Sequence, residues 1–318
     1  MHFIKLIRPL NLIIIAISMY GIAWYFEGVY TIESSLGIKS FLFFLLVFST
    51  VMIAAAGNII NDYFDIKADL INKPDRVIIG KFVKRRVAIL SHWMINFLAF
   101  SIAVYLSWRL QTYWYLFIHL LTINLLWYYS LRLKREFFIG NFLIAGLTAL
   151  VPLLVGYYYF HIRDINEFPT VENNFYPFAQ SAIAIYTLLL TFAISGFAFV
   201  MNLAREIIKD MEDMEGDKKL RAKTLPIVLG ILKTKWVSGI ILSATILISV
   251  SIWAVYSAIP LISMIPVFLS ALLILVCFIL LIISSTKSQF RAINHLIKLA
   301  MIFGMLTPVY WRIIMIYG

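Results

Sequence analysis

The sequence predicts an all-α, polytopic membrane protein with nine transmembrane helices around a central chamber, on three observations. First, 62% of its 318 residues are hydrophobic and 14% are charged, whereas soluble domains carry about a quarter charged residues. The mean hydropathy of +0.92 agrees with this excess. Second, nine apolar stretches approach the roughly 20 residues that a helix needs to cross a bilayer. Third, basic residues alternate strongly between the segments that connect these stretches.

The nine stretches predict one helix each. The first follows Lys5 and Arg8 and resembles a signal peptide, but no small-residue cleavage site follows it, so we expect a retained helix. We expect a single membrane domain over residues 1–318, with 161–176 as its sizeable external loop. The expected spans are 9–30, 39–61, 87–108, 113–131, 138–160, 177–204, 236–257, 260–283 and 293–316.

The distribution of Lys and Arg predicts the orientation in the membrane. Of the 27 basic residues, 23 fall in the N-terminus and the segments 62–86, 132–136, 205–235 and 284–298. The alternate segments hold only Lys39, Arg109, Arg163 and Arg312. Cytoplasmic loops are the basic ones, so we expect a cell-membrane protein with a cytoplasmic N-terminus and an external C-terminus. Topology thus explains the net charge of +11. We expect no nucleic-acid partner and no obligate protein partner.

Two Asp triplets share one spacing. Asp62, Asp65 and Asp69 map by a constant offset onto Asp210, Asp213 and Asp217. Positions i, i+3 and i+7 lie on one helical face, so each triplet forms a row of carboxylates. The match predicts an internal repeat in which helices two to five, residues 39–160, correspond to helices six to nine, residues 177–316. Each unit has an even number of spans, so the two copies are parallel.

Three carboxylates on one face repel each other unless a cation lies among them. Clusters of oxygen ligands suit a hard divalent ion, and Mg²⁺ typically takes one or two protein carboxylates together with substrate phosphates. We therefore predict that all six aspartates are magnesium ligands. Arg205 and Lys209 beside the second row would contact phosphate, and Asn58 shares the first row's face. The alternative is that these charges mark solvated helix ends, and the paired triplets favour the metal site over it.

These motifs resemble the UbiA superfamily of intramembrane prenyltransferases along the whole chain. The family motif N-D-x-x-D-x-x-x-D matches residues 61–69, its N-x-P-x-R continuation matches residues 72–76, and its D-x-x-x-D motif matches Asp213 and Asp217. The resemblance implies that both motifs hold Mg²⁺ ions bridging an allylic diphosphate. Loss of the diphosphate would leave a carbocation-like prenyl group for an acceptor.

The resemblance also implies roles for single residues. A family Tyr-x-x-x-Lys motif is matched with one extra residue by Tyr129 and Lys134, and with the family spacing by Tyr128 and Arg132, so Lys134 and Arg132 are both candidates. We favour Lys134. The expected catalytic residues are Asp65, Asp69, Asp213 and Lys134. The expected diphosphate-binding residues are Asn58, Asn61, Lys73, Arg76, Arg8, Tyr129, Lys134, Arg205 and Lys209.

The stretch 205–217 and the following Thr224-Leu225-Pro226-Ile227 resemble the ether-lipid enzymes of that superfamily. Their implied substrates are geranylgeranyl diphosphate and the hydroxyl of geranylgeranylglyceryl phosphate. The acceptor's phosphate would need further cations, for which the sequence offers Lys84, Arg85, Arg86, Lys218, Lys219, Arg221 and Lys223.

Two alternatives remain open from the sequence. One is prenylation of an aromatic acceptor in quinone or pigment biosynthesis. The other, more remote, is a divalent-cation transporter, which should place ionisable groups near the bilayer midplane. His92 and His119 are the few candidates at that depth.

Overall fold

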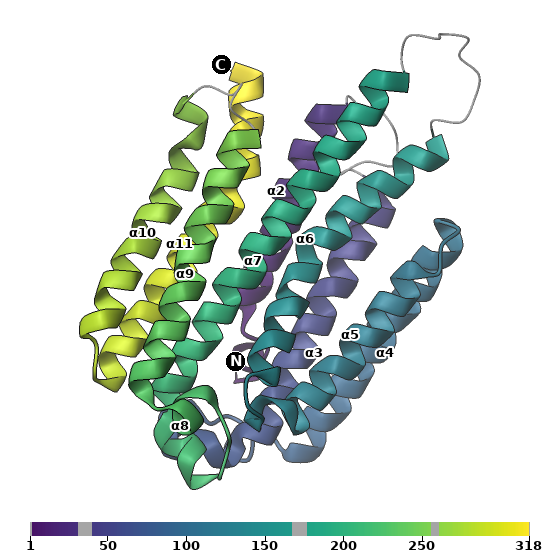
Figure 1. The fold of residues 1–318 in the computed structure, drawn as a ribbon. Helices are drawn as coiled ribbons and strands as arrows, with labels where there is room; N and C mark the ends of the chain where they lie inside the picture. Colours follow the sequence, from purple (N-terminus) through teal and green to yellow (C-terminus); the bar gives the residue numbers. More distant parts are fainter. Residues whose placement is uncertain (1, 31–39, 167–176, 256–260, 318) are drawn as a thin grey trace.

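The computed structural model describes residues 2–30, 40–166, 177–255 and 261–317, and within them every regular element is a helix (Figure 1). The predicted all-α class is confirmed. The long helices are α2 (Pro9–Tyr30), α3 (Phe41–Asn72), α4 (Arg85–Arg109), α5 (Trp114–Leu131), α6 (Ile139–Asn166), α7 (Pro177–Lys219), α9 (Ile231–Val255), α10 (Ile265–Ile283) and α11 (Lys287–Tyr317). Short elements are α1 (His2–Ile7), α8 (Leu225–Leu229) and the 3₁₀ turns η1 (Pro74–Arg76), η2 (Leu133–Arg135) and η3 (Leu261–Met264).

Each predicted span overlaps one long helix. In the described ranges, eight helices are long and apolar enough to cross a membrane, namely α2, α3, α4, α6, α7, α9, α10 and α11. The chain is therefore a multi-pass membrane protein. The stretch predicted at 113–131 does form helix α5, but α5 is not among the eight. It has only 18 residues, and they include the polar His119, Thr122 and Asn124.

Several long helices extend beyond their predicted spans; α9 begins at Ile231 rather than 236, and α11 at Lys287 rather than 293. Helix α3 continues to Asn72 rather than ending at residue 61, and α7 continues to Lys219 rather than 204. Both Asp triplets therefore lie on regular helix. Helix α3 ends where Pro74 disfavours a helical conformation at Lys73. Helix α6 reaches Asn166, so the predicted external loop is shorter at its start, and its residues 167–176 lie outside the described part of the chain.

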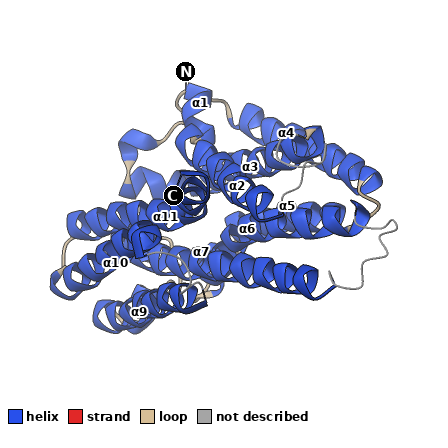
Figure 2. Ribbon diagram, turned by 90° about the horizontal axis from the view of Figure 1, so that it is seen from above, coloured by secondary structure: helices blue, strands red, loops and turns tan. Residues whose placement is uncertain are grey.

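The helices form a bundle in which α2, α6 and α7 lie between two groups, α3 to α5 on one side and α9 to α11 on the other (Figures 1 and 2). Large side chains such as Phe26, Phe43, Tyr159 and Trp311 fill the interior near the start of α3. Phe43 precedes Asp65 by 22 helical residues, which corresponds to about 33 Å along the axis. This apolar cluster therefore fills the end of the bundle away from the Asp rows.

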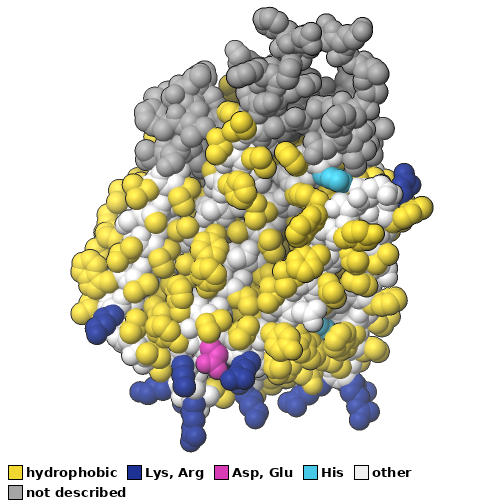
Figure 3. Space-filling model, turned by 45° about the vertical axis from the view of Figure 1, so that its right-hand side comes forward, with side chains coloured by type: hydrophobic (Ala, Val, Ile, Leu, Met, Phe, Trp, Pro, Cys, Tyr) yellow, Lys and Arg dark blue, Asp and Glu magenta, His cyan; other side chains and the backbone are white. Residues whose placement is uncertain are grey.

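The surface has the pattern of a membrane protein. Figure 3 shows a broad belt of hydrophobic side chains on one face, with Lys and Arg gathered along its lower edge. Large apolar side chains such as Phe97 and Trp236 are exposed on the outside of the bundle. Exposed apolar area of this extent would be unfavourable in water and is suited to contact with lipid.

Candidate active site

The C-terminal ends of α3 and α7 bring both Asp rows to one cavity of about 780 Å³. Of the residues predicted for the site, Asn58 is not part of its lining, and the side chain of Arg76 lies outside the described part of the structure. The predicted residues that line the cavity are Arg8, Asn61, Asp62, Asp65, Asp69, Lys73, Tyr129, Lys134, Arg205, Lys209, Asp210, Asp213 and Asp217.

Asn72 joins the two Asp-bearing helices directly. Its Nδ2 donates to the carbonyl oxygen of Asp213 at 3.1 Å, and its Oδ1 accepts from the backbone N–H of Gly216 at 3.0 Å. A Cβ at Gly216 would approach Nδ2 of Asn72 to 2.4 Å, so this close contact requires glycine. The Asn72–Gly216 contact therefore fixes the separation of the two rows.

Three of the six aspartates are ion-paired with cations from other elements. Lys73 Nζ lies 2.8 Å from Asp213 Oδ1, Lys134 pairs with Asp65, and Arg8 pairs with Asp62. The side chains of Asp69 and Asp217 form no hydrogen bond or ion pair with any described residue. The cavity therefore combines paired and unpaired carboxylates, with three cations close to them.

Arg8 reaches the cavity from the junction of α1 and α2. Its φ of +56° is unusual for a residue other than glycine. The following Pro9 disfavours the right-handed helical conformation at this position, so the chain turns here. Such strained positions cluster at functional sites. The turn directs the Arg8 side chain toward Asp62 on α3.

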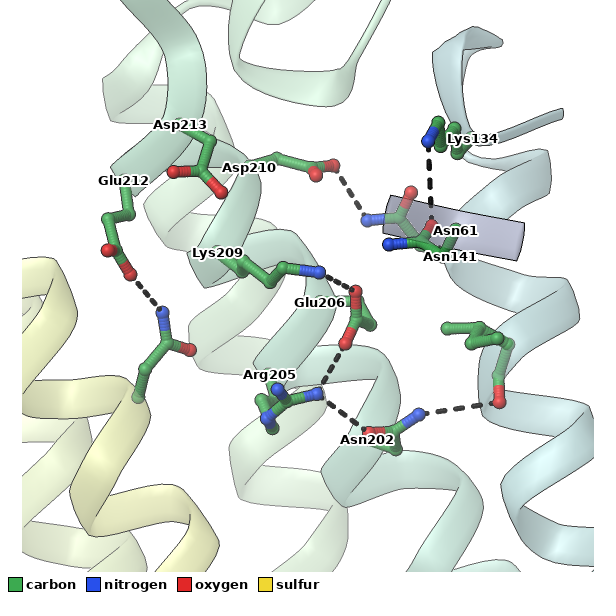
Figure 4. Close-up of polar contacts among 12 residues, drawn as sticks. Asn61, Lys134, Asn141, Asn202, Arg205, Glu206, Lys209, Asp210, Glu212 and Asp213 are labelled. Atoms are coloured by element: carbon green, nitrogen blue, oxygen red, sulfur yellow. Dashed lines mark hydrogen bonds and ion pairs between the residues drawn. The ribbon is translucent and has the colours of Figure 1, made fainter. Parts of the chain in front are cut away.

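Helix α7 carries a second set of polar contacts (Figure 4). Buried Glu206 pairs with Arg205 and, at 3.1 Å, with Lys209. Asp210 accepts a hydrogen bond from Asn141 Nδ2 of α6 at 2.8 Å. Figure 4 shows that the Arg205, Glu206 and Lys209 side chains point toward one another. The two cations beside the second row are thus held in place by Glu206, which the sequence analysis gave no role.

Lys134 lies in η2, where its ammonium group reaches Asp65. Burial lowers the pKa of Lys134 below its ordinary value, and the Asp65 carboxylate opposes that shift. Gly140 permits this placement, because a Cβ there would lie 2.6 Å from Cα of Lys134. Arg132 is exposed and lies 3.5 Å from Glu136. Of the two candidates, Lys134 lines the cavity and Arg132 does not.

A second cavity of about 290 Å³ extends from the first into the bundle. The two share residues at their junction, including Arg8, Tyr129 and Arg205. Much of the remaining lining is apolar and includes Ile53, Leu126, Leu147, Val151 and Leu154. The site therefore joins a charged mouth to an apolar chamber, which suits a molecule with a phosphorylated head and a hydrocarbon chain.

The two buried histidines have partners in the protein. His119 contacts Ser49 Oγ at 2.8 Å and the carbonyl oxygen of Tyr115 at 2.7 Å. His92 contacts the carbonyl oxygen of Ala56 at 2.9 Å. Both therefore serve contacts between and within helices. Asn58 likewise donates to the carbonyl oxygen of Ile7 at 2.9 Å and lines the apolar chamber.

Within the described ranges, no three His, Cys, Asp or Glu side chains are grouped closely enough to form a complete metal site. The donor chemistry nevertheless fits Mg²⁺, because the rows offer carboxylate oxygens only and Asp69 and Asp217 have no other partner. Mg²⁺ commonly completes its octahedron with water and substrate phosphates rather than with protein groups.

The structure also adds residues that the sequence analysis missed. Buried Glu212 accepts hydrogen bonds from Arg291 Nε at 3.0 Å and from Asn294 Nδ2 at 3.1 Å, and Lys73 lies 3.5 Å away. Arg291, Asn294, His295 and Lys298 of α11 all line the charged cavity. Their i, i+3, i+4 and i+7 spacing could have been recognised if the last helix had been extended toward residue 287.

A helical membrane bundle in which a mouth lined by carboxylates and cations opens into an apolar chamber is suited to phosphorylated lipids. The sequence model of the UbiA prenyltransferase family matches residues 12–303, and the chain belongs to this family. It is therefore a prenyltransferase.

Among curated relatives, a digeranylgeranylglyceryl phosphate synthase of Thermococcus gammatolerans is 36% identical over 207 residues, which are 64% of this chain and 63% of the relative. The chain thus matches less than two thirds of that relative's length. A synthase of the same name from Thermococcus sibiricus is 33% identical over 78% of this chain and 75% of its own length.

Solved structures share the fold. A structure concerning digeranylgeranylglyceryl phosphate synthase is 24% identical, with a TM-score of 0.66 over 98% of both chains. A UbiA homolog from Archaeoglobus fulgidus bound to GPP and Mg²⁺ is 14% identical, with a TM-score of 0.56 over 96% of this chain and 99% of that one. At these identities the likeness concerns the fold.

Proposed function

We propose that the chain transfers a geranylgeranyl group from its diphosphate to the hydroxyl of geranylgeranylglyceryl phosphate in a Mg²⁺-dependent reaction. The names of its curated relatives support these substrates. The observation that carries the proposal is the pair of Asp rows facing one cavity that continues into an apolar chamber.

The Asp rows hold Mg²⁺ in this proposal, with Asp69 and Asp217 available without loss of an existing partner. The bound ion supplies positive charge that stabilises the leaving diphosphate. Lys134 and Lys73 turn from Asp65 and Asp213 to the phosphate oxygens and add charge-assisted hydrogen bonds. Arg8, at the junction of α1 and α2, likewise turns from Asp62 to the phosphate oxygens.

The chamber holds the prenyl chain and keeps water from the reacting carbon. The acceptor's hydroxyl oxygen forms a bond to the first carbon of the prenyl group as the bond from that carbon to the diphosphate oxygen breaks. The bonding electrons leave with the diphosphate, which also takes up the hydroxyl proton. Arg205 and Lys209, held by Glu206 beside the mouth, stabilise the negative charge that develops.

We infer that α5 also crosses the membrane, which brings the number of spans to nine. We further infer that the ends of α3 and α7 that carry the Asp rows face the cytoplasm. The concentration of 23 basic residues on that side supports the orientation. We also infer the parallel repeat, in which α3 to α6 correspond to α7 and α9 to α11. An interior proline in the last helix of each half, Pro152 in α6 and Pro308 in α11, supports this correspondence.

The test uses the purified protein in vesicles with labelled geranylgeranyl diphosphate and Mg²⁺. One reaction contains geranylgeranylglyceryl phosphate and the other contains 4-hydroxybenzoate. We expect a product of doubled prenyl content from the glyceryl phosphate, identified by mass spectrometry. Product from the aromatic acceptor alone would refute the proposed acceptor, and transport of divalent ions without product would refute the proposed activity.

A further inference from the structure

Helix α11 contributes a polar wall to the charged cavity. Arg291, Asn294, His295 and Lys298 lie on one helical face because they are spaced by one and two turns. All four line the cavity of about 780 Å³. This row is separate from the two Asp rows and from the residues that pair with Asp65, Asp62 and Asp213.

The first half of the row is anchored to α7. Arg291 and Asn294 donate to the two carboxylate oxygens of Glu212, whose side chain is 6% exposed. A buried carboxylate with several such partners holds the neighbouring helices in one register. The Glu212 contacts therefore fix the position of α11 along α7, and with it the position of the following residues His295 and Lys298.

The second half of the row is not engaged. The exposed His295 and Lys298 form no hydrogen bond or ion pair with any described residue, although both line the cavity. Lys298 is near enough to Arg8, Arg205 and Lys209 to be repelled by their charges, and near enough to Glu206 to be attracted by its charge. Those three cations have carboxylate partners in Asp62 and Glu206, whereas Lys298 has none. A cation in such a place is stabilised by binding an anion.

The position of Lys298 suits the second phosphorylated substrate. In a glycerol phosphate the free hydroxyl and the phosphate ester sit on carbons of one three-carbon unit, so the phosphate must bind close to the reacting hydroxyl. The cations that bind this phosphate must therefore line the reaction cavity. None of the seven basic residues that the sequence offered for this role, at 84–86 and 218–223, lines it.

Lys298 lines the charged mouth but not the apolar chamber, and it belongs to α11, whereas Lys73 and Lys134 belong to the segments that follow α3 and α5. The diphosphate, in contrast, is expected between the Asp rows, next to Lys73 and Lys134. We propose that Lys298, with His295 one turn away, forms the subsite for the phosphomonoester of the acceptor lipid. This inference rests on the proposed function.

The experiment compares the wild type with Lys298→Met, which keeps the length of the side chain and removes its charge. The KM of each substrate is measured with the other saturating. Because a hydrogen bond to a charged group contributes enough to change binding about 10- to 100-fold, we expect a rise of that size in the KM for geranylgeranylglyceryl phosphate. The KM for geranylgeranyl diphosphate should stay within about twofold, which also shows that the variant is folded.

Three further arms sharpen the result. Lys298→Arg should restore most of the affinity for the acceptor. Lys233→Met removes an exposed lysine of α9 that does not line the cavity, and it should change neither KM. With geranylgeranylglycerol, which lacks the phosphate, the wild type and Lys298→Met should have the same KM.

The outcomes separate the two proposals. A wild type that does not use the glyceryl phosphate would overturn both. A wild type that uses it, together with an unchanged acceptor KM in Lys298→Met, would overturn the phosphate subsite alone. An equal rise in the KM of both substrates would assign Lys298 to the diphosphate, and an equal rise with the dephosphorylated acceptor would show a packing role. Each of these results contradicts the inference.

Discussion

Replacing Gly216 by Ala should separate the two Asp rows and weaken Mg²⁺-dependent transfer. The new Cβ would lie 2.4 Å from Nδ2 and 2.7 Å from Oδ1 of Asn72, so the Asn72 side chain must move. It then loses its hydrogen bonds to the Asp213 carbonyl and the Gly216 N–H. Two hydrogen bonds at about 0.5–1.5 kcal/mol each predict a loss of about 1–3 kcal/mol in stability.

The effect on catalysis should exceed the effect on stability. A displacement of about 1 Å at a reaction centre can reduce the rate about 100-fold, so we expect kcat for Gly216→Ala to fall roughly 10- to 100-fold. The half-saturating Mg²⁺ concentration should rise as well. Asn72→Ala removes the same hydrogen bonds without a clash and should have a similar effect, and the double variant should be no worse than the sum of its parts.

Gly196→Ala is the matched control. It lies on the same helix, α7, and a Cβ there meets nothing within 4 Å. Alanine favours helix over glycine by up to about 1 kcal/mol, so this variant should be as active as the wild type and as stable or more so. The assay is transfer of labelled prenyl group over a Mg²⁺ titration. If Gly216→Ala behaves like Gly196→Ala, the Asn72 contact does not set the separation of the rows.

Three further variants test single contacts. Lys134→Met should lower kcat at least about 100-fold in the same assay, because a charge-assisted contact to the leaving diphosphate is lost, whereas Arg132→Met should keep activity within about twofold. Asp213→Asn should abolish transfer at physiological Mg²⁺, with exposed Glu215→Gln as a control of unchanged activity; retained transfer in Asp213→Asn would contradict the metal assignment. Glu212→Gln should lower the thermal midpoint, with a cost of about 3 kcal/mol, because it breaks a buried ion-paired group; an unchanged midpoint would show that Glu212 does not anchor α11.

The sequence predicted the helices well and their ends poorly. Hydropathy changes where a helix leaves the membrane, so the predicted spans stopped at residues 61 and 204, while hydrogen bonding continued the helices to Asn72 and Lys219. Pro74 was the available signal for the first of these ends, since it prevents the helix from continuing. The same bias delayed the predicted start of α11 to residue 293, which removed Arg291 from consideration.

The charged mouth was predictable because its ligands repeat within the sequence, and most of the predicted residues line one cavity. The residues that hold those ligands were not predictable. Glu212 lies off the face of its own Asp row, and its partners come from α11, about 80 residues later in the chain. Asn72 was noticed only as part of a motif, although it joins α3 to α7. Such contacts depend on how helices pack, and no local spacing encodes them.

The internal pairing of the site leads to a prediction about the order of binding. Asp65 and Asp213 are paired with Lys134 and Lys73, so Mg²⁺ that binds to either of these two aspartates alone must separate a carboxylate from a largely buried cation. Uncompensated buried charge is costly. A diphosphate that arrives with Mg²⁺ gives those lysines new partners at the same time, so the two ligands should bind cooperatively, with a coupling of about 1–3 kcal/mol.

Lys134→Met provides the test, because it removes one of the competing cations while leaving Asp65 intact. Calorimetric titration with Mg²⁺ alone should therefore show tighter binding to Lys134→Met than to the wild type, although the variant is the poorer catalyst. With a non-reactive diphosphate analogue present, the advantage should disappear or reverse, because the analogue lacks its lysine partner. If Mg²⁺ alone bound the variant no more tightly than the wild type, the Lys134–Asp65 pair would not restrain metal binding. The cooperativity would then need another origin.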